Sequence, residues 1–308
     1  MNRIKILLLV ILIGLNFNTS FCQNYVDLIN GFYTNTPLNQ FDSSLKKTRV
    51  QDINVSVLVP KKLSEKNTII LGLETEWMYA ALTPTGNSGS VSSFGAKIGL
   101  NKQLSDKWNG TMILIPKLAS DFKNSTGGIV AEDFQLGLFS MFKYSVRTDK
   151  KYKVGLYYNG ELFGPFFSPI IGLYYKGKNG KTELDLSLPF LADFSYQINN
   201  KVKIGSRFNA FVRTFHLHDY YYHSKGEYLA KTSNEMFGYA CFEPKKGFLV
   251  KANIGYSIGR NYLLYDIEDK VAFGLSAFRF GDKRHQLNAD FADGLLFRIE
   301  LIYRYYTH

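Results

Sequence analysis

The stretch KYKVGLYYNGELFGPFFSPIIGLYYKGKNGKTELDLSLPF, residues 151–190, decides the fold. From Tyr152 to Tyr158 the even positions are apolar or aromatic, and the odd positions around them are mostly polar, charged or glycine. A period of two predicts a β-strand with one apolar face and one hydrated face. The dipeptide Asn179-Gly180 favours a tight hairpin turn, and the alternation resumes at residues 184–188.

The same alternation continues along most of the chain. Many of its runs reach the 9–11 residues that a tilted membrane strand needs, whereas soluble strands commonly stop near five or six. Short charged turns such as PKKLSEKN and RTDKK alternate with longer polar loops such as TPTGNSGS, as periplasmic turns alternate with extracellular loops. We therefore predict an all-β chain that forms an antiparallel up-and-down transmembrane β-barrel of about 14 strands (12–16), and we rank a soluble β protein second.

Two regions are harder to assign from the pattern. Residues 184–198 fit either one bent strand or two short strands, and the assignment of residues 285–294 is open. Residues 271–275 are predicted as the penultimate strand. The segment HLHDYYYHSKGEYLAKTSN, residues 216–234, is predicted as the longest loop.

The N-terminal segment is expected to be a secretory signal peptide. Arg3 and Lys5 precede an apolar run that is too short to cross about 30 Å of hydrocarbon. Ser20 and Cys22 occupy the positions of a cleavage site, which gives a signal peptide of residues 1–22 and a barrel domain of residues 23–308. Lipidation of Cys22 is the less favoured alternative, because Phe21 directly before the cysteine fits it poorly. Cys241 is then the single cysteine of the mature chain, so no internal disulfide is expected. The predicted location is the outer membrane of a Gram-negative bacterium.

The composition agrees with that location. Aromatic residues make up 16% of the chain, as in barrels with aromatic girdles at both lipid–water boundaries. The formal charge of +11 suits outer-membrane lipid and lipopolysaccharide as partners. No basic patch or motif for nucleic acid appears, so nucleic acid is excluded as a partner.

Several segments carry a resemblance to a known family. The segments VDLINGFYTNTP, GLYYNGELFGPFFSPIIGLYYK, FSYQINNKVKIG and DGLLFRIELIYRYY resemble an uncharacterised outer-membrane β-barrel family of Gram-negative bacteria, a domain of unknown function. The resemblance covers nearly the whole mature chain and implies the fold, but it implies no chemistry. It also implies the barrel assembly machinery as a partner, although the ending Tyr306-Thr307-His308 places the aromatic residue two positions early.

The charged residues of the polar faces are the candidates for function. They either line a pore and select solutes or fill a closed barrel with ion pairs. The candidate lumen-lining charges are Glu74, Glu76, Glu161, Lys203, Arg207, Arg213, Lys251, Arg298, Glu300 and Arg304, and the same alternation adds Lys153, Glu183 and Asp185.

The predicted long loop offers other candidates. Tyr220, Tyr221 and Tyr222 form an aromatic group that we regard as a candidate loop contact for a protein partner. His216 and His218 share a face with a spacing that suits a metal ion, but no cysteine or carboxylate spacing supports it. His223 and Ser224 have the residue types of a lipid hydrolase but are adjacent in the chain, where side chains diverge. We therefore expect no catalytic residue, no metal and no cofactor.

The sequence leads to an ordered set of functions. The first is a passive channel or a binding lumen for small polar solutes. The alternative is a structural or docking barrel whose lumen is plugged by charge pairs and which acts through its extracellular loops. An outer-membrane lipid hydrolase is a distant third, and we expect no enzyme activity.

Overall fold

A computed structural model describes residues 25–306, except 42–43, 82–87, 124–127 and 219–225. One short 3-10 helix, η1, occupies Ala131–Asp133. Within these described ranges, no helix has the length and apolar character needed to cross a membrane. The strands are β1 (Tyr25–Phe41), β2 (Ser44–Lys62), β3 (Asn67–Ala81), β4 (Ser88–Gln103), β5 (Trp108–Ser120), β6 (Phe134–Arg147), β7 (Lys150–Glu161), β8 (Gly164–Lys176), β9 (Thr182–Leu188), β10 (Leu191–Asn199), β11 (Val202–Leu217), β12 (Glu227–Lys245), β13 (Phe248–Asp266), β14 (Phe273–Leu275), β15 (Phe278–Phe280) and β16 (Leu295–Tyr306).

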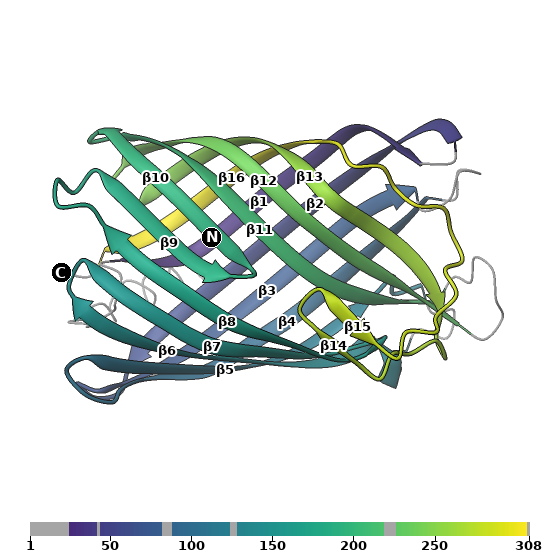
Figure 1. Ribbon diagram of the computed structural model, residues 1–308, viewed down its shortest axis with the longest axis horizontal. Helices are drawn as coiled ribbons and strands as arrows, with labels where there is room; N and C mark the ends of the chain where they lie inside the picture. The colour runs from purple at the N-terminus through teal and green to yellow at the C-terminus, as the bar shows by residue number, and fades with distance from the viewer. Residues whose placement is uncertain (1–24, 42–43, 82–87, 124–127, 219–225, 307–308) are drawn as a thin grey trace, which may run out of the picture.

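The strands close into a barrel in which neighbours in the chain are neighbours in the wall (Figure 1). β1 pairs antiparallel with β2 on one edge and with β16 on the other, and β8 pairs with β9 to complete the circle. Of the sixteen strands in the sheet, β14 and β15 form a side hairpin, so fourteen strands build the wall. The predicted antiparallel barrel of about 14 strands is confirmed.

The strands point their apolar side chains outward and their charged side chains inward. In β3, Leu73 is 66% exposed whereas Glu76 is 2% exposed, and in β13 Ile254 is 63% exposed whereas Lys251 is 5% exposed. An apolar band around the whole molecule would be unfavourable in water, but it is what a bilayer requires of a barrel. Strands of 15 and 19 residues, as in β3 and β13, are also long enough to cross at a tilt. The fold is therefore that of a transmembrane barrel.

The two ends of the barrel differ. At one end, which we name the turn end, the strands are joined by the short segments 63–66, 104–107, 148–149, 177–181, 200–201 and 246–247. The pairing of Tyr25 with Tyr306 places both ends of the described chain at this turn end. In the predicted Asn-Gly turn, Gly180 has a φ of 70°, which glycine adopts without a steric cost. We name the opposite end the loop end, and it carries the long 267–294 connection between β13 and β16.

The wall is incomplete at the loop end between β8 and β11. β9 and β10 have only 7 and 9 residues, and their hairpin ends midway along the barrel (Figure 1). Toward the loop end, the pairing of β9 with β8 stops at Ile171, and the pairing of β10 with β11 stops at Asn209. The β14–β15 hairpin pairs in parallel with the free edge of β8 at Phe166 and Phe167, so it covers part of this gap.

The free part of β11 bends into the barrel. Near the turn end its even-numbered residues face outward, and Ile204 is 45% exposed. Near the loop end Thr214 and His216, on the same face, are buried. Gln135 and Glu161, from the inner faces of β6 and β7, form hydrogen bonds with Thr214. The loop-end part of β11 therefore lies against the inside of the opposite wall.

This inward bend closes the loop end with apolar side chains. Inner-face residues of β2–β5 meet residues of β11–β13 and of the 267–294 connection in one buried cluster, which we name the loop-end plug. Its members are Val50, Met78, Ala80, Val91, Ala119, Phe215, Leu217, Leu229, Tyr262, Leu264 and Phe291, with Leu287 and Ala289 packed against them.

The structure resolves one open assignment and changes two local predictions. Of the two alternatives for residues 184–198, it shows two short strands, β9 and β10. Residues 271–275 contribute only the side strand β14 and no part of the wall. The predicted loop 216–234 contains the first half of a long strand, because β12 begins at Glu227. Residues 227–231 are buried on both faces, so the alternation that marks a strand in the sequence is missing there.

Candidate functional site: a pocket in the charged lumen

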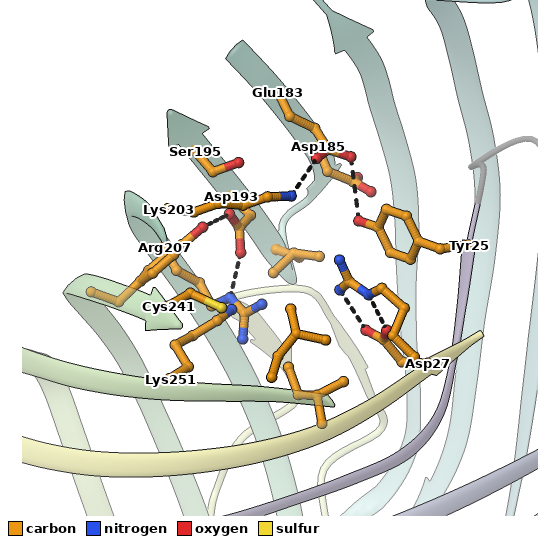
Figure 2. A pocket seen from close by; sticks show the side chains of 15 residues that line it. Tyr25, Asp27, Glu183, Asp185, Asp193, Ser195, Lys203, Arg207, Cys241 and Lys251 are labelled. Carbon is orange, nitrogen blue, oxygen red and sulfur yellow. Dashed lines mark hydrogen bonds and ion pairs between the residues drawn. The ribbon is translucent and has the colours of Figure 1, made fainter. Parts of the chain in front are cut away.

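A cavity of about 220 Å³ opens in the lumen near the turn end (Figure 2). It is lined by side chains of β1, β9–β13 and β16, so distant parts of the chain contribute to it. The lining residues are Tyr25, Asp27, Glu183, Asp185, Leu191, Asp193, Ser195, Lys203, Arg207, Tyr239, Cys241, Leu249, Lys251, Ile302 and Arg304. Four of these are acidic and four are basic, so the lining has no net charge.

Arg207 organises one side of the pocket. Its Nε donates to Asp193 Oδ2 at 2.6 Å, and its Nη1 donates to Glu300 Oε1 at 3.2 Å. Asp193 also accepts a hydrogen bond from the Tyr239 hydroxyl at 2.6 Å. Lys251 Nζ lies 3.6 Å from Glu300 Oε2 and 4.3 Å from the centroid of the Tyr239 ring. Because these pairs are buried and share partners, each side chain is held in a fixed position.

Arg304 organises the opposite side. Its guanidinium donates to both carboxylate oxygens of Asp27, at 2.6 and 3.0 Å, and lies 3.6 Å from the centroid of the Tyr25 ring. The Tyr25 hydroxyl donates to Glu183 of β9 at 3.3 Å, and Glu183 Oε2 lies 3.8 Å from Lys203 Nζ. Tyr25 and Glu183 thus connect β1 and β9, two strands that are not neighbours in the wall.

A second group of charges crosses the lumen deeper in the barrel, and we name it the central ion cluster. Lys231 of β12 donates to Asp52 of β2 and, at 2.6 Å, to Glu76 Oε1 of β3. Arg213 of β11 forms an ion pair with the other oxygen of Glu76. β3 and β11 lie almost opposite each other in the wall, whereas β1, β16 and β13 separate β2 from β12, so the cluster crosses part of the lumen beneath the loop-end plug.

The remaining predicted charges form separate pairs. Arg298 donates to Glu235 Oε2 at 2.7 Å, and its guanidinium also contacts the Phe32 and Phe237 rings. Glu74 pairs with Lys97 at 2.6 Å. Glu161 accepts from Thr214 at 2.6 Å, away from the pocket. Lys153 pairs with Asp185.

The structure brings together six of the predicted charges at the pocket, with Glu300 behind them: Glu183, Asp185, Lys203, Arg207, Lys251 and Arg304. Tyr220, Tyr221, Tyr222, His223 and Ser224 lie outside the described residues. The sequence did not identify six of the partners in these contacts, namely Asp27, Asp52, Lys97, Asp193, Lys231 and Glu235.

The reasons for these omissions differ. Asp52 and Asp193 follow the alternation of their strands, so the signal was present in the sequence. Asp27 does not follow it, because a register irregularity between Asp27 and Ile29 shifts the inward face of β1. Lys231 lies in the part of β12 that was predicted as a loop.

The fold and its charged interior define the chain as a β-barrel of the outer-membrane type. The chain belongs to the family described as a domain of unknown function (DUF6268), whose model matches residues 32–291. This family agrees with the resemblance that the sequence segments indicated. A comparison with curated proteins finds no match.

Solved outer-membrane barrels are similar to this chain in overall architecture. The translocator domain of the autotransporter NalP from Neisseria meningitidis is 12% identical, with a TM-score of 0.40, and the match covers 98% of this chain and 94% of that one. An outer-membrane channel from Pseudomonas putida F1 is 8% identical, with a TM-score of 0.46 and coverages of 90% and 94%. The Pseudomonas putida toluene transporter TodX is 9% identical, with a TM-score of 0.38 and coverages of 89% and 88%. Because the sequence identities and TM-scores are this low, the similarity concerns the architecture and says nothing about function.

Proposed function

We propose that this protein resides in the outer membrane of a Gram-negative bacterium and binds small polar solutes that enter its lumen from the periplasm. The turn end would face the periplasm, since barrels of this type have short periplasmic turns and both chain termini on that side. Export requires the expected signal peptide, residues 1–22, which lies outside the described residues.

The pocket at the turn end is the observation that carries the proposal. Its lining is neutral overall but contains charges of both signs, phenol groups and a small apolar floor of Leu249 and Ile302. Such a lining offers partners to a small molecule with both donor and acceptor groups, and fixed charges in a lumen discriminate among solutes. The balanced lining does not support the anion preference that the overall positive charge suggests.

Passage beyond the pocket requires movement in the loop half of the barrel. The central ion cluster and the loop-end plug close the lumen in this conformation. We therefore propose a gated lumen, in which displacement of the 267–294 connection opens a path to the outside.

Conductance in a planar bilayer tests this function. Refolded residues 23–308 should insert stably and remain mostly closed, with rare openings. A variant with Leu287→Ser and Phe291→Ser should open more often. Loss of the Phe291 burial alone removes about 2 kcal/mol from the closed state, which corresponds to roughly a thirtyfold change in the equilibrium between closed and open states. Leu63→Ser, in an exposed turn, serves as the matched control.

The selectivity of the openings adds a second readout. Arg207→Ser leaves Asp193 and Glu300 with fewer cationic partners, so the reversal potential in a salt gradient should shift toward cation preference. An unchanged reversal potential would contradict a conducting path through the pocket.

A second candidate function is a sealed barrel that acts through its loops. The favouring observation is the packing of the loop-end plug, in which Met78, Ala80, Phe215 and Leu229 are completely buried. Stable insertion with no conductance in either the wild type or the plug variant would favour this function over the gated lumen.

A further inference from the structure

Two histidines and two aspartates converge at the loop end, outside the pocket. His216 and His218 come from the end of β11, Asp133 from η1, and Asp121 from the residue directly after β5. The inward bend of β11 brings them together, and the backbone N–H of Asp121 donates to the His216 carbonyl at 3.0 Å. Ligand atoms of Asp133, His216 and His218 all lie within 4.8 Å of one another.

The contacts in this cluster give each imidazole a defined orientation. His216 Nδ1 lies 2.8 Å from Asp133 Oδ1. His218 Nδ1 lies 3.0 Å from Asp121 Oδ1 and 3.1 Å from the Ser120 hydroxyl. The backbone N–H of Val130 donates to Asp133 Oδ2 at 3.1 Å, which fixes the carboxylate between the two rings.

His218 Nε2 is the unexplained atom of the cluster. It is buried and has no hydrogen-bond partner among the described residues, and the His218 side chain is 10% exposed. Its nearest charged neighbour, Asp133 Oδ2, lies 3.8 Å away, too far for a hydrogen bond. A buried nitrogen without a partner is costly. When Nδ1 of His218 donates a hydrogen bond to Asp121, Nε2 carries a lone pair and lies near the Asp133 carboxylate. A cation between Nε2 and this carboxylate would stabilise the arrangement.

We propose that Asp133, His216 and His218 bind a divalent transition-metal ion of the zinc type. Two imidazole nitrogens and one carboxylate are ligands that zinc accepts, with three protein ligands leaving one position open. Metal–ligand distances of about 2.0–2.1 Å place tetrahedral ligands about 3.3 Å apart. The two histidines approach different oxygens of Asp133, at 2.8 Å from Oδ1 and 3.8 Å from Oδ2, and one ligand atom from each residue lies within 4.8 Å of the others. Side-chain rotations that draw these atoms together would complete the ligand set.

Asp121 has a supporting role in this site. A histidine that binds a metal through one nitrogen commonly donates its other N–H to a carboxylate, which fixes the ring and strengthens the ligand. His218 has this arrangement, with Asp121 at Nδ1 and the unpartnered Nε2 on the side of Asp133.

The metal site joins segments that are far apart in the chain. β11 contacts β5 at this point through the pairing of His216 with Ser120, and Asp133 lies in η1. A bound ion holds the end of β11 against the inner face of the opposite wall and so stabilises the closed loop end. This proposed metal site is independent of whether the turn-end pocket binds small polar solutes.

Metal titration of the refolded mature chain, without an affinity tag and freed of metal with EDTA, tests this inference. Zn²⁺ measured by calorimetry should bind at one site per chain, and Co²⁺ should give visible absorption bands of a four-coordinate site. His218→Ala and Asp133→Asn should abolish both signals. Asp121→Asn, which leaves the ligands intact, should weaken Zn²⁺ binding about 10- to 100-fold. His285→Ala, an exposed histidine elsewhere, is the matched control and should bind as the wild type does.

The thermal unfolding midpoint of the wild type gives a second test, which does not require that any variant folds. Zn²⁺ should raise the midpoint of the metal-free wild type, because a ligand that binds the folded state stabilises it. The absence of saturable binding by the wild type would overturn the proposal. Binding that persists unchanged in His218→Ala and Asp133→Asn would also overturn it.

Discussion

The central ion cluster allows a test of whether water reaches the lumen at this depth. Lys231 is 2% exposed and its ammonium is the common partner of Asp52 and Glu76. Lys231→Met keeps most of the side-chain volume and removes the charge. The two carboxylates then remain in the barrel with one cation fewer.

The expected cost follows from that geometry. Removing one partner of a buried ion pair costs about 3–5 kcal/mol. Arg213 still contacts Glu76, so only Asp52 loses its cation completely within the cluster. We therefore expect the lower end, about 3 kcal/mol, or roughly a 100-fold shift in the unfolding equilibrium.

Equilibrium unfolding in urea measures this cost, with the protein folded in lipid vesicles and followed by tryptophan fluorescence. Lys107→Met, in an exposed turn, is the control and should change the free energy of unfolding by less than about 0.5 kcal/mol. Adding Asp52→Asn to Lys231→Met should recover a large part of the loss, because the stranded charge is then removed.

Two outcomes would refute the reasoning. A cost below about 1 kcal/mol, the range of exposed ion pairs, would mean that water solvates the cluster. The absence of any recovery in the double variant would mean that the loss has another cause. Either result would favour an open lumen at this depth.

Two further predictions concern packing and pH. In Gly205→Ala, the added Cβ would lie 2.5 Å from Tyr239 Cζ and 2.3 Å from the Phe194 carbonyl oxygen, so we expect a loss of about 1–3 kcal/mol in urea unfolding. Gly238→Ala, whose Cβ meets nothing within 4 Å, should be nearly neutral, and equal effects of the two changes would contradict this account. Hydrogen bonds from Arg284 hold the pKa of Asp282 below its usual value, against a smaller opposing effect of burial. The stabilisation is therefore present above the unfolded pKa of about 3.9 and is lost as the pH falls through the lower folded pKa. The thermal midpoint of the wild type should thus fall more steeply in acid than that of Asp282→Asn, and parallel curves would argue against the pair.

The alternation of side chains was sufficient to predict the barrel. Which face of a strand is charged is a local property, so Glu76 and Lys251 could be assigned to the interior from their neighbours in the sequence. The same rule failed at Asp27, where an irregular register shifts the inward face, and at Lys231, where both faces of β12 are buried. Asp52 and Asp193 follow the rule, so only Asp27 and Lys231 were out of its reach.

The candidate sites were less accessible to sequence reasoning. Alternation predicts that Arg207 and Glu300 point into the lumen, but it does not predict that they meet, because they are 93 residues apart in the chain. His216 and His218 were recognised as a pair, but Asp133 and Asp121 lie 83 and 97 residues away from their respective partners. No spacing within the sequence reveals carboxylates at that distance.

The sequence by itself determined the all-β class, the membrane-facing exterior and the polar interior, because these depend on successive side chains pointing to opposite faces of a strand. The tertiary structure alone decided that β11 bends into the lumen at the loop end. The short β9–β10 hairpin leaves the loop-end half of β11 without a neighbour on that edge, and β11 finds its partners inside the lumen instead. That displacement forms the loop-end plug and brings the histidines to the aspartates, and it depends on contacts between strands that are far apart in the chain.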